Sequence, residues 1–92
     1  MKKYGIKYHP AVKSADMPRL SFEMKARIRK AIEERIMTAP HEYGLPLRKT
    51  LKGYWKLRVG NYRVVYKVAG DTATIFCISH RKDVYQMAGK RY

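Results

Sequence analysis

Six side chains in the second half of the chain carry cationic, imidazole or phenol groups, which together can bind and cleave RNA without a metal. They are Lys56, Arg58, Arg63, His80, Arg81 and Tyr85. Cations grip phosphates, and an exposed aromatic ring stacks on an unpaired base. Attack of a ribose 2′-OH on the adjacent phosphate needs a base, cations at the phosphoryl oxygens and an acid at the leaving 5′-oxygen. A neutral lysine can serve as that base. The alternative interpretation of these six side chains is a basic surface that only faces solvent.

A β-hairpin over Lys52–Lys67 is expected to gather the first three of these side chains. Gly60-Asn61 supplies its two-residue turn, because Gly and Asn tolerate positive φ. Directly paired residues share a face, so Arg58 lies opposite Arg63 and on the side of Lys56. The other face collects apolar side chains and needs a cover: Trp55, Leu57, Val59, Tyr62, Val64, Tyr66 and Val68.

A second turn at Gly70-Asp71 leads into a third predicted strand over Thr72–His80. Counting pairs across this turn brings Ile78 opposite Arg63, and it places His80 on the basic face. The same face then holds three side chains that are too apolar to be left bare, namely Val65, Phe76 and Ile78. We expect the final segment of the chain to cover them.

The remaining elements complete an α+β fold. Lys3–Tyr8 alternates and predicts a strand, and Ala11–Asp16 predicts a helical turn. From Ser21 to about Met37, apolar residues recur every three or four positions, which predicts a helix that covers the hairpin's apolar face. Residues 81–92 suit a turn and a short helix. The result is a small single domain over 1–92, ordered β-α-α-β-β-β(-α), whose antiparallel meander sheet has helices packed on one face.

The charge of the chain predicts an anionic partner. The 92 residues carry 21 Lys and Arg against seven acids, a formal net charge of +14. Nucleic acid, an acidic protein and a membrane surface all suit such a charge. We expect no membrane span, because no apolar run approaches the ~20 residues required. With one cysteine, Cys77, and no signal-peptide core, a cytoplasmic location is expected.

No metal or cofactor is expected. The three histidines, His9, His41 and His80, lack the companion residues of a metal site. The sequence also contains no phosphate-binding glycine loop and no nucleophile elbow. The candidate chemistry therefore depends on lysine, arginine, histidine and tyrosine alone.

Two runs give the sequence a family resemblance. L-R-V-G-N-Y-R-V-V-Y-K-V, followed by I-F-C-I-S-H-R-K-D-V-Y, resembles the RelE/ParE toxin superfamily of toxin–antitoxin systems over nearly the whole chain. The resemblance implies either a RelE-type, ribosome-dependent mRNA endonuclease or a ParE-type toxin that poisons DNA gyrase. ParE-like toxins generally lack the full set of nuclease side chains, whereas this chain has Lys56, Arg63, Arg81 and Tyr85 together. The RelE type is therefore favoured.

The RelE resemblance also implies roles for individual residues. Lys56 matches the proposed general base, Arg63 the arginine that stabilises the phosphate, and Arg81 the general acid. Tyr85 matches the tyrosine that orients or stacks on the mRNA. The link before Tyr85 is shorter than in RelE, so His80 competes with Arg81 for the role of acid.

Further residues are expected to bind RNA around this centre, and one of them departs from the RelE pattern. Tyr54 stands where RelE carries a second lysine. The expected RNA-binding residues are Lys49, Lys52, Tyr54, Arg58, Lys67 and Lys82. The implied partners are an acidic antitoxin that covers the basic surface, the ribosome and mRNA. A gyrase inhibitor and a basic RNA-binding module without catalysis remain alternative interpretations.

Overall fold

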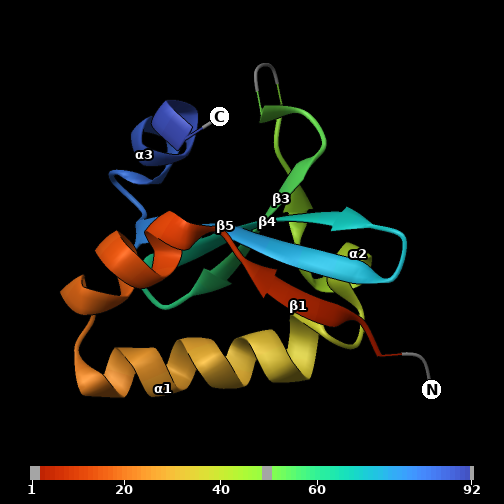
Figure 1. Ribbon diagram of the computed structural model, residues 1–92, viewed down its shortest axis with the longest axis horizontal. Helices are drawn as coiled ribbons and strands as arrows, with labels where there is room; N and C mark the ends of the chain where they lie inside the picture. The colour runs from red at the N-terminus through yellow and green to blue at the C-terminus, as the bar shows by residue number, and fades with distance from the viewer. Residues whose placement is uncertain (1–2, 49–50, 92) are drawn as a thin grey trace.

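The computed structural model describes residues 3–48 and 51–91, and a five-stranded sheet lies at its centre (Figure 1). The strand order is β1-β5-β4-β3-β2. The strands are β1 (Gly5–Tyr8), β2 (Leu45–Pro46), β3 (Tyr54–Val59), β4 (Tyr62–Ala69) and β5 (Thr72–His80). β3, β4 and β5 form the predicted antiparallel meander, whereas β1 pairs with β5 in parallel and makes the sheet mixed.

Helical segments cover both faces of this sheet. They are η1 (Val12–Asp16), η2 (Met17–Arg19), α1 (Phe22–Ala31), η3 (Ile32–Ile36), α2 (Pro40–Tyr43) and α3 (Val84–Arg91). The Ser21 side chain caps α1 as predicted, because its hydroxyl accepts the Met24 N–H at 3.1 Å. Figure 1 shows α1 and α3 on opposite sides of the sheet. The final segment therefore supplies the cover that the basic face was expected to need.

The hairpin of β3 and β4 has the predicted register. Gly60 adopts a φ of 60°, and Val59 pairs with Tyr62 directly beyond the turn. Arg58 pairs with Arg63, as expected from the alternation of side chains. The turn residues and the two-residue period were enough to fix this part of the sheet.

The register between β4 and β5 differs from the prediction because a β-bulge interrupts the ladder. Val65 pairs with Cys77, but the next residue of β4, Tyr66, pairs with Ile75, so Phe76 is the extra residue. The bulge shifts every later pair by one position, and one position turns a side chain to the other face. Arg63 therefore pairs with Ser79 and not with Ile78.

The bulge divides the apolar side chains of β5 between two cores. Ile75 and Ile78 belong to the larger core under α1, together with Val64 and Tyr66. Phe76 and Cys77 point to the other side, into a smaller core under α3 that also contains Val65, Val84 and Ala88. The expectation that Ile78 lies on the basic face was therefore wrong.

A buried tyrosine fixes the loop that leads into β2. The Tyr66 hydroxyl donates a hydrogen bond to the Pro40 carbonyl at 2.5 Å, and burial raises the pKa of Tyr66 to about 12. A Cβ added to Gly44 would lie 1.9 Å from that hydroxyl oxygen, so only glycine fits at this position. The contact holds β2 beside β3, where Leu45 of β2 pairs with Lys56 of β3.

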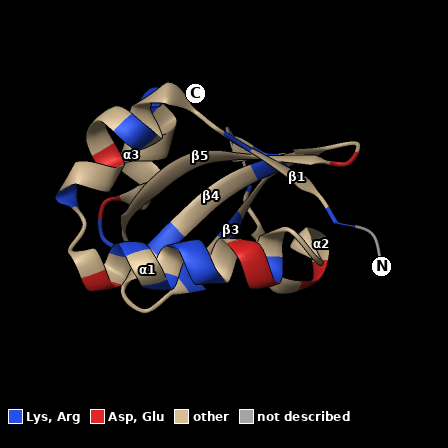
Figure 2. Cartoon of the chain, turned by 60° about the horizontal axis from the view of Figure 1, so that its bottom comes forward, with Lys and Arg blue, Asp and Glu red and all other residues tan. Residues whose placement is uncertain are grey.

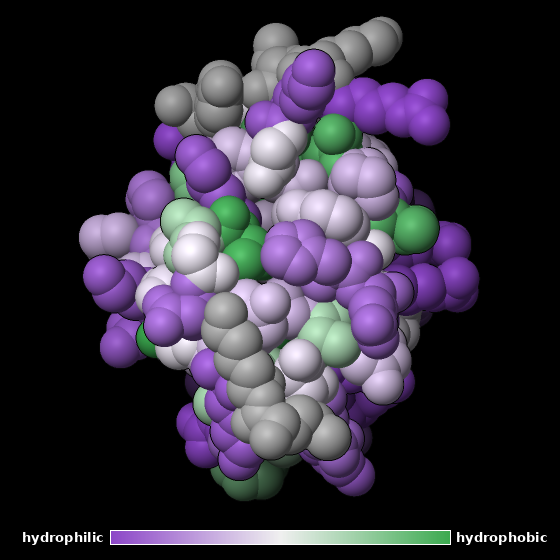
Figure 3. Space-filling view, turned by 90° about the vertical axis from the view of Figure 1, so that its right-hand side faces the viewer, coloured by the Kyte–Doolittle hydropathy of each residue, from purple (hydrophilic) through white to green (hydrophobic). Residues whose placement is uncertain are grey.

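The surface is strongly basic over several elements. Figure 2 shows Lys and Arg along α1 as well as on the sheet, with acidic residues near the start of α1 and just beyond its end. On the side shown in Figure 3, hydrophilic side chains dominate and hydrophobic ones form small separate patches. Within the described ranges, no helix has the length and apolar character needed to cross a bilayer.

Candidate active site on the basic sheet face

Lys56 and Arg63 lie on the same face of the sheet, on adjacent strands. Lys56 pairs with Val65, and Arg58 pairs with Arg63, so the side chains of Lys56, Arg58 and Arg63 all point toward the side of α3. This arrangement is the one that the predicted catalytic centre required. A pocket of about 200 Å³ opens between them, lined by Tyr43, Leu45, Lys56, Arg58 and Arg63.

Tyr85 from α3 reaches Lys56 directly. The Lys56 Nζ lies 2.5 Å from the Tyr85 hydroxyl oxygen and 5.2 Å from the centre of the Tyr85 ring. The ring is 53% exposed, so one side of it is free to contact a ligand. A second pocket, of about 430 Å³, opens beside this pair and includes Arg48. Lys56 therefore stands between two pockets, with an exposed ring above it.

Arg63 is held against the hairpin turn. Its Nη1 donates to the Gly60 carbonyl at 3.1 Å and to the Tyr62 carbonyl at 2.9 Å. Arg81 begins the segment after β5 at the same turn, because its backbone N–H donates to the Asn61 carbonyl at 2.8 Å. The turn thus brings the backbone of Arg81 to the place where the Arg63 guanidinium lies, and the exposed Arg81 side chain starts from there.

His80 does not share this face. Because of the bulge, His80 pairs with Tyr62, and the two rings meet edge to face with centres 5.6 Å apart. Its Nδ1 accepts the backbone N–H of Lys82 at 3.3 Å. The expected placement of His80 beside Lys56 and Arg63 was wrong, and of the two candidate acids Arg81 is the one whose backbone meets the turn.

The predicted RNA-binding residues divide into exposed and packed ones. Arg58, Lys67, Lys52 and Lys82 are exposed, whereas Lys49 lies outside the described residues. Tyr54 is half-buried and belongs to the smaller core, where its ring lies 4.8 Å from that of Phe76. Tyr54 is therefore a packing residue in this fold, not an open platform for a base.

An ion pair that the sequence analysis missed fixes α3 in place. Arg91 and Asp16 form a two-pronged contact, with Nη1 2.5 Å from Oδ2 and Nη2 2.5 Å from Oδ1. Asp16 also accepts the Ile78 N–H at 2.8 Å, and Arg91 donates to the Phe76 carbonyl at 3.2 Å. The hydrogen bond to Asp16 raises the pKa of Arg91. This pair holds the last turn of the helix whose first turn carries Tyr85.

The site offers acid–base and cationic groups but neither a metal cluster nor a reactive thiol. The described residues contain no group of three or more His, Cys, Asp or Glu side chains arranged to hold a metal. Cys77 is buried, and burial, followed by the nearby Asp16 carboxylate, raises its pKa to about 11. A thiol of that kind is a poor nucleophile at neutral pH. The lysine and arginine side chains of the site can bind phosphate, and the site's ionisable groups can take part in proton transfer.

Comparison with known sequences finds toxins of toxin–antitoxin systems. The family described as the ParE toxin of the type II toxin–antitoxin system parDE matches residues 7–85. The toxin RelE3 of Methanocaldococcus jannaschii is 34% identical over 76% of this chain and 83% of its own length. The toxin RelE of Mycobacterium tuberculosis is 32% identical, over 87% of this chain and 88% of its own length.

Comparison with solved structures gives the same result. The chain superposes with a TM-score of 0.81 on a chain of the toxin–antitoxin complex RelBE2 from Mycobacterium tuberculosis. The sequence identity is 26%, and the match covers 90% of this chain and 97% of that one. The likeness therefore extends over most of the fold.

Proposed function

Because this chain belongs to the RelE/ParE superfamily of toxins from type II toxin–antitoxin systems, we propose that it is a ribosome-dependent mRNA endonuclease. Cleavage proceeds without a metal, by attack of a ribose 2′-OH on the adjacent phosphate. The bond between phosphorus and the 5′-oxygen breaks, and the products are a 2′,3′-cyclic phosphate and a 5′-hydroxyl. One domain over residues 1–92 carries the activity, in the cytoplasm where ribosomes translate.

Each side chain of the basic face has a role in this reaction. Lys56, in its neutral form, takes the proton of the 2′-OH. Arg63 balances the charge that develops on the phosphoryl oxygens, and Arg81 protonates the leaving 5′-oxygen. Tyr85 orients Lys56 through its hydroxyl and offers its exposed ring to a base. Each acid or base contributes roughly 10²–10⁴-fold to the rate, and the fixed cations add an electrostatic contribution of comparable size.

The contact between Lys56 and Tyr85 is the observation that carries this proposal. It joins two residues 29 positions apart, from β3 and α3, at a distance of 2.5 Å. Arg58 and Arg63 stand beside it on the same face, and in the described ranges the only ion pair is the one between Arg91 and Asp16. The cations of the site are thus not neutralised by carboxylates and are available to phosphates.

The expected partners follow from the same charge. An acidic antitoxin covers the basic face and holds the toxin inactive, while ribosomal RNA supplies much of the binding in the active state. Phosphate contacts release counterions, so binding to ribosomes weakens steeply as salt rises. One structural relative is a chain of the toxin–antitoxin complex RelBE2. This likeness supports the proposal that the inhibitor is a protein.

Expression of variants in bacterial cells tests the proposed site. The double variant Lys56→Ala with Arg63→Ala is expected to abolish growth arrest and the mRNA cuts seen by primer extension. The matched control, Lys7→Ala with Arg29→Ala, removes two exposed charges from β1 and α1 and is expected to keep both effects. Folding of each variant is checked by circular dichroism. Unchanged toxicity of a folded Lys56/Arg63 double variant would exclude this site.

A gyrase inhibitor is the second candidate, because the matching family is described by the ParE toxin. One feature of the site fits this candidate: at the position where RelE carries a second lysine, this chain has Tyr54, which packs against Phe76. A toxin of this class would arrest growth with intact mRNA and an SOS response. Primer extension on mRNA from the same cells separates the two candidates.

A further inference from the structure

A pocket of about 230 Å³ opens on the side of the sheet that α1 covers, whereas Lys56 points to the side of α3. Its floor is apolar, because it is lined by Ile28, Ile32 and Ile78, each 3% exposed or less. Met17 adds a thioether beside them. An apolar cavity of about 150 Å³ is large enough to hold a benzene molecule. This pocket therefore has room for one ring with a short substituent.

Six elements meet around this pocket, so the fold shapes it and not a single loop. Tyr8 ends β1, Lys13 lies in η1, and Met17 begins η2. Figure 1 shows η1 and η2 directly after β1, above one end of α1. The Ile78 backbone N–H donates to the buried Asp16 carboxylate at 2.8 Å, and this bond fixes the junction of η1 and η2 against β5. The pocket is thus formed before any ligand arrives, as ligand sites usually are.

The rim of the pocket carries two cations and a phenol. Lys13 and Arg29 are exposed, and Tyr8 is 38% exposed. The Lys13 Nζ lies 5.4 Å from the centre of the Tyr8 ring. Burial raises the pKa of Tyr8, while Arg29 lowers it and Glu33 raises it further. The Tyr8 hydroxyl therefore keeps its proton at neutral pH and can donate a hydrogen bond.

The two cations of the rim are not neutralised by carboxylates. Within residues 3–48 and 51–91, the ion pair joins Arg91 and Asp16, and the described side chains that line the pocket include no acid. Glu33, four residues after Arg29, is exposed and does not line the pocket. A guanidinium pairs with a carboxylate through two parallel hydrogen bonds. The charge of the rim therefore favours an anion, and the floor favours an apolar group attached to it.

We propose that this pocket binds a small aromatic monocarboxylate, with its ring on the isoleucine floor and its carboxylate at the rim. The Arg29 guanidinium pairs with the carboxylate, Lys13 adds a second positive charge, and the Tyr8 hydroxyl donates a hydrogen bond to it. This site does not depend on the nuclease, because the pocket and Lys56 lie on opposite faces of the sheet.

A nucleotide does not fit the same pocket. A base carries donors and acceptors on its edges, and these cost free energy when they are buried against three isoleucines without partners. Pockets for drug-sized ligands measure about 300–1,000 Å³, and this one is smaller. A flexible aliphatic chain would match the floor but would lose more conformational freedom on binding than a rigid ring does. A single ring with one carboxylate satisfies both the floor and the rim.

Methyl NMR of the full chain, labelled at isoleucine, tests the location of the site. Titration with phenylacetate is expected to shift the methyl signals of Ile28, Ile32 and Ile78, because the bound ring lies against them. A Kd on the order of 0.1–1 mM is expected for a ligand of about ten non-hydrogen atoms. The isoleucines outside the pocket are internal controls whose signals should not move, namely Ile6, Ile36 and Ile75.

Two further probes separate the contribution of the charge from that of the ring. Phenylacetamide keeps the ring but is neutral, and acetate keeps the carboxylate but has no ring. Loss of the charge-assisted hydrogen bonds is expected to weaken binding of phenylacetamide about tenfold relative to phenylacetate. Acetate is expected to cause no shift of the three pocket isoleucines at the same concentrations, because it leaves the apolar floor uncovered.

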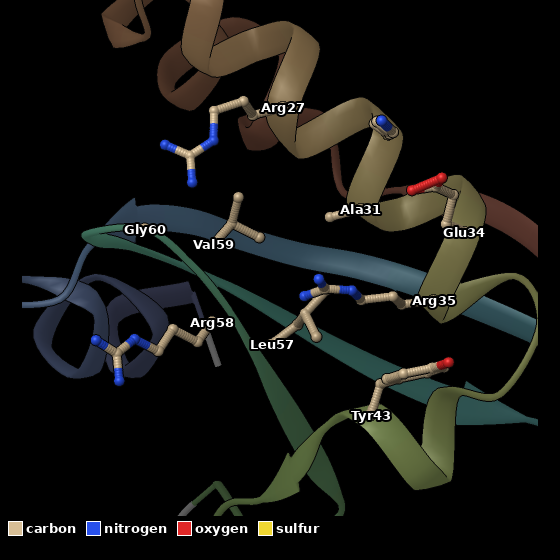
Figure 4. A pocket seen from close by; sticks show the side chains of 10 residues that line it. Arg27, Ala31, Glu34, Arg35, Tyr43, Leu57, Arg58, Val59 and Gly60 are labelled. Carbon is tan, nitrogen blue, oxygen red and sulfur yellow. The ribbon is translucent and has the colours of Figure 1, made fainter.

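Two arginine variants locate the carboxylate at the rim. Arg29→Ala is expected to weaken binding of phenylacetate about tenfold and to leave that of phenylacetamide within about twofold. The matched control is Arg27→Ala. Arg27 is also exposed on α1, but it extends over a separate groove of about 650 Å³ between α1 and β3, as Figure 4 shows. The control is expected to leave both affinities unchanged, and the isoleucine spectrum reports whether each variant is folded.

Three results would overturn the proposed pocket. The first is that phenylacetate shifts none of the three pocket isoleucines, or shifts all six isoleucines equally. The second is equal binding of phenylacetate and phenylacetamide, and the third is an equal effect of Arg29→Ala and Arg27→Ala on phenylacetate. None of these measurements depends on mRNA cleavage, so failure of the proposed nuclease and failure of this site are told apart.

Discussion

Removal of Arg91 is expected to destabilise the fold and to disorganise the proposed active site at the same time. Arg91 meets Asp16 through two nitrogen–oxygen contacts of 2.5 Å, and the two side chains are 9% and 2% exposed. In Arg91→Ala the carboxylate stays buried with only the Ile78 N–H as a partner. Loss of one partner of a buried ion pair costs about 3–5 kcal/mol.

The lower end of that range applies here, because Asp16 keeps the hydrogen bond from Ile78. A loss of about 3 kcal/mol is a large part of the roughly 5–14 kcal/mol that stabilises a domain of this length. The corresponding decrease in the melting temperature is about 12–24 °C. Because Arg91 lies on the helix that carries Tyr85, the contact between Tyr85 and Lys56 should weaken as well.

Urea denaturation followed by circular dichroism measures the free energy of unfolding, and amide hydrogen exchange reports on α3. The control is Lys90→Ala, which removes an exposed neighbouring cation and should change stability by less than about 0.5 kcal/mol. Arg91→Met combined with Asp16→Asn should recover much of the loss, since no uncompensated charge remains. If Arg91→Ala costs no more than Lys90→Ala, the ion pair does not hold α3.

The remaining predictions concern single side chains. Tyr85→Phe removes the hydroxyl bonded to Lys56 but keeps the ring, so mRNA cleavage should fall less than in Tyr85→Ala; equal losses in primer-extension signal would deny a separate role to the ring. His80→Ala should leave cleavage within about threefold, whereas Arg81→Ala should reduce it at least about 10²-fold; the reverse order in a cleavage assay would make the histidine the acid. Burial raises the pKa of Cys77 to about 11, so at pH 8 only about one thiol in 10³ is ionised. Alkylation of Cys77 should therefore be slow in the folded protein, and its rate should rise with pH and on unfolding in urea. Rapid labelling at pH 7 would contradict this burial.

The turn residues and the alternation of side chains were sufficient to predict the hairpin that carries the site. Gly60-Asn61 has one favourable place in a hairpin, and the alternation from Trp55 to Tyr66 allows one register. The face shared by Lys56 and Arg63 followed from these two facts. The helix after Ser21 was equally readable, because its apolar residues recur at helical spacing.

The bulge in β5 could not be read from the sequence. The run Ile75-Phe76-Cys77-Ile78 is apolar throughout, so no alternation marks which residue is extra. Each of its side chains finds a core, because α1 covers one face and α3 the other. The error in the position of His80 came from this ambiguity alone.

Contacts between distant parts of the chain were also beyond sequence reasoning. Asp16 and Arg91 are 75 positions apart, and nothing in the local pattern of either residue identifies its partner. β2 is two residues long and includes a proline, so it exists only because β3 lies beside it. The apolar side of α3, by contrast, had a signal in the helical spacing of Val84 and Ala88.

The chemistry of the cut ends tests the central claim most directly. Ribosomes are programmed with one mRNA, the cleavage position is mapped, and a second mRNA carries a single 2′-deoxy nucleotide on the 5′ side of that position. If Lys56 and Arg63 promote attack by the 2′-OH, the unmodified mRNA is cut to a 2′,3′-cyclic phosphate and a 5′-hydroxyl, and the modified one stays intact there. Cleavage of the deoxy substrate at the same rate, or fragments with a 5′-phosphate, would contradict the account.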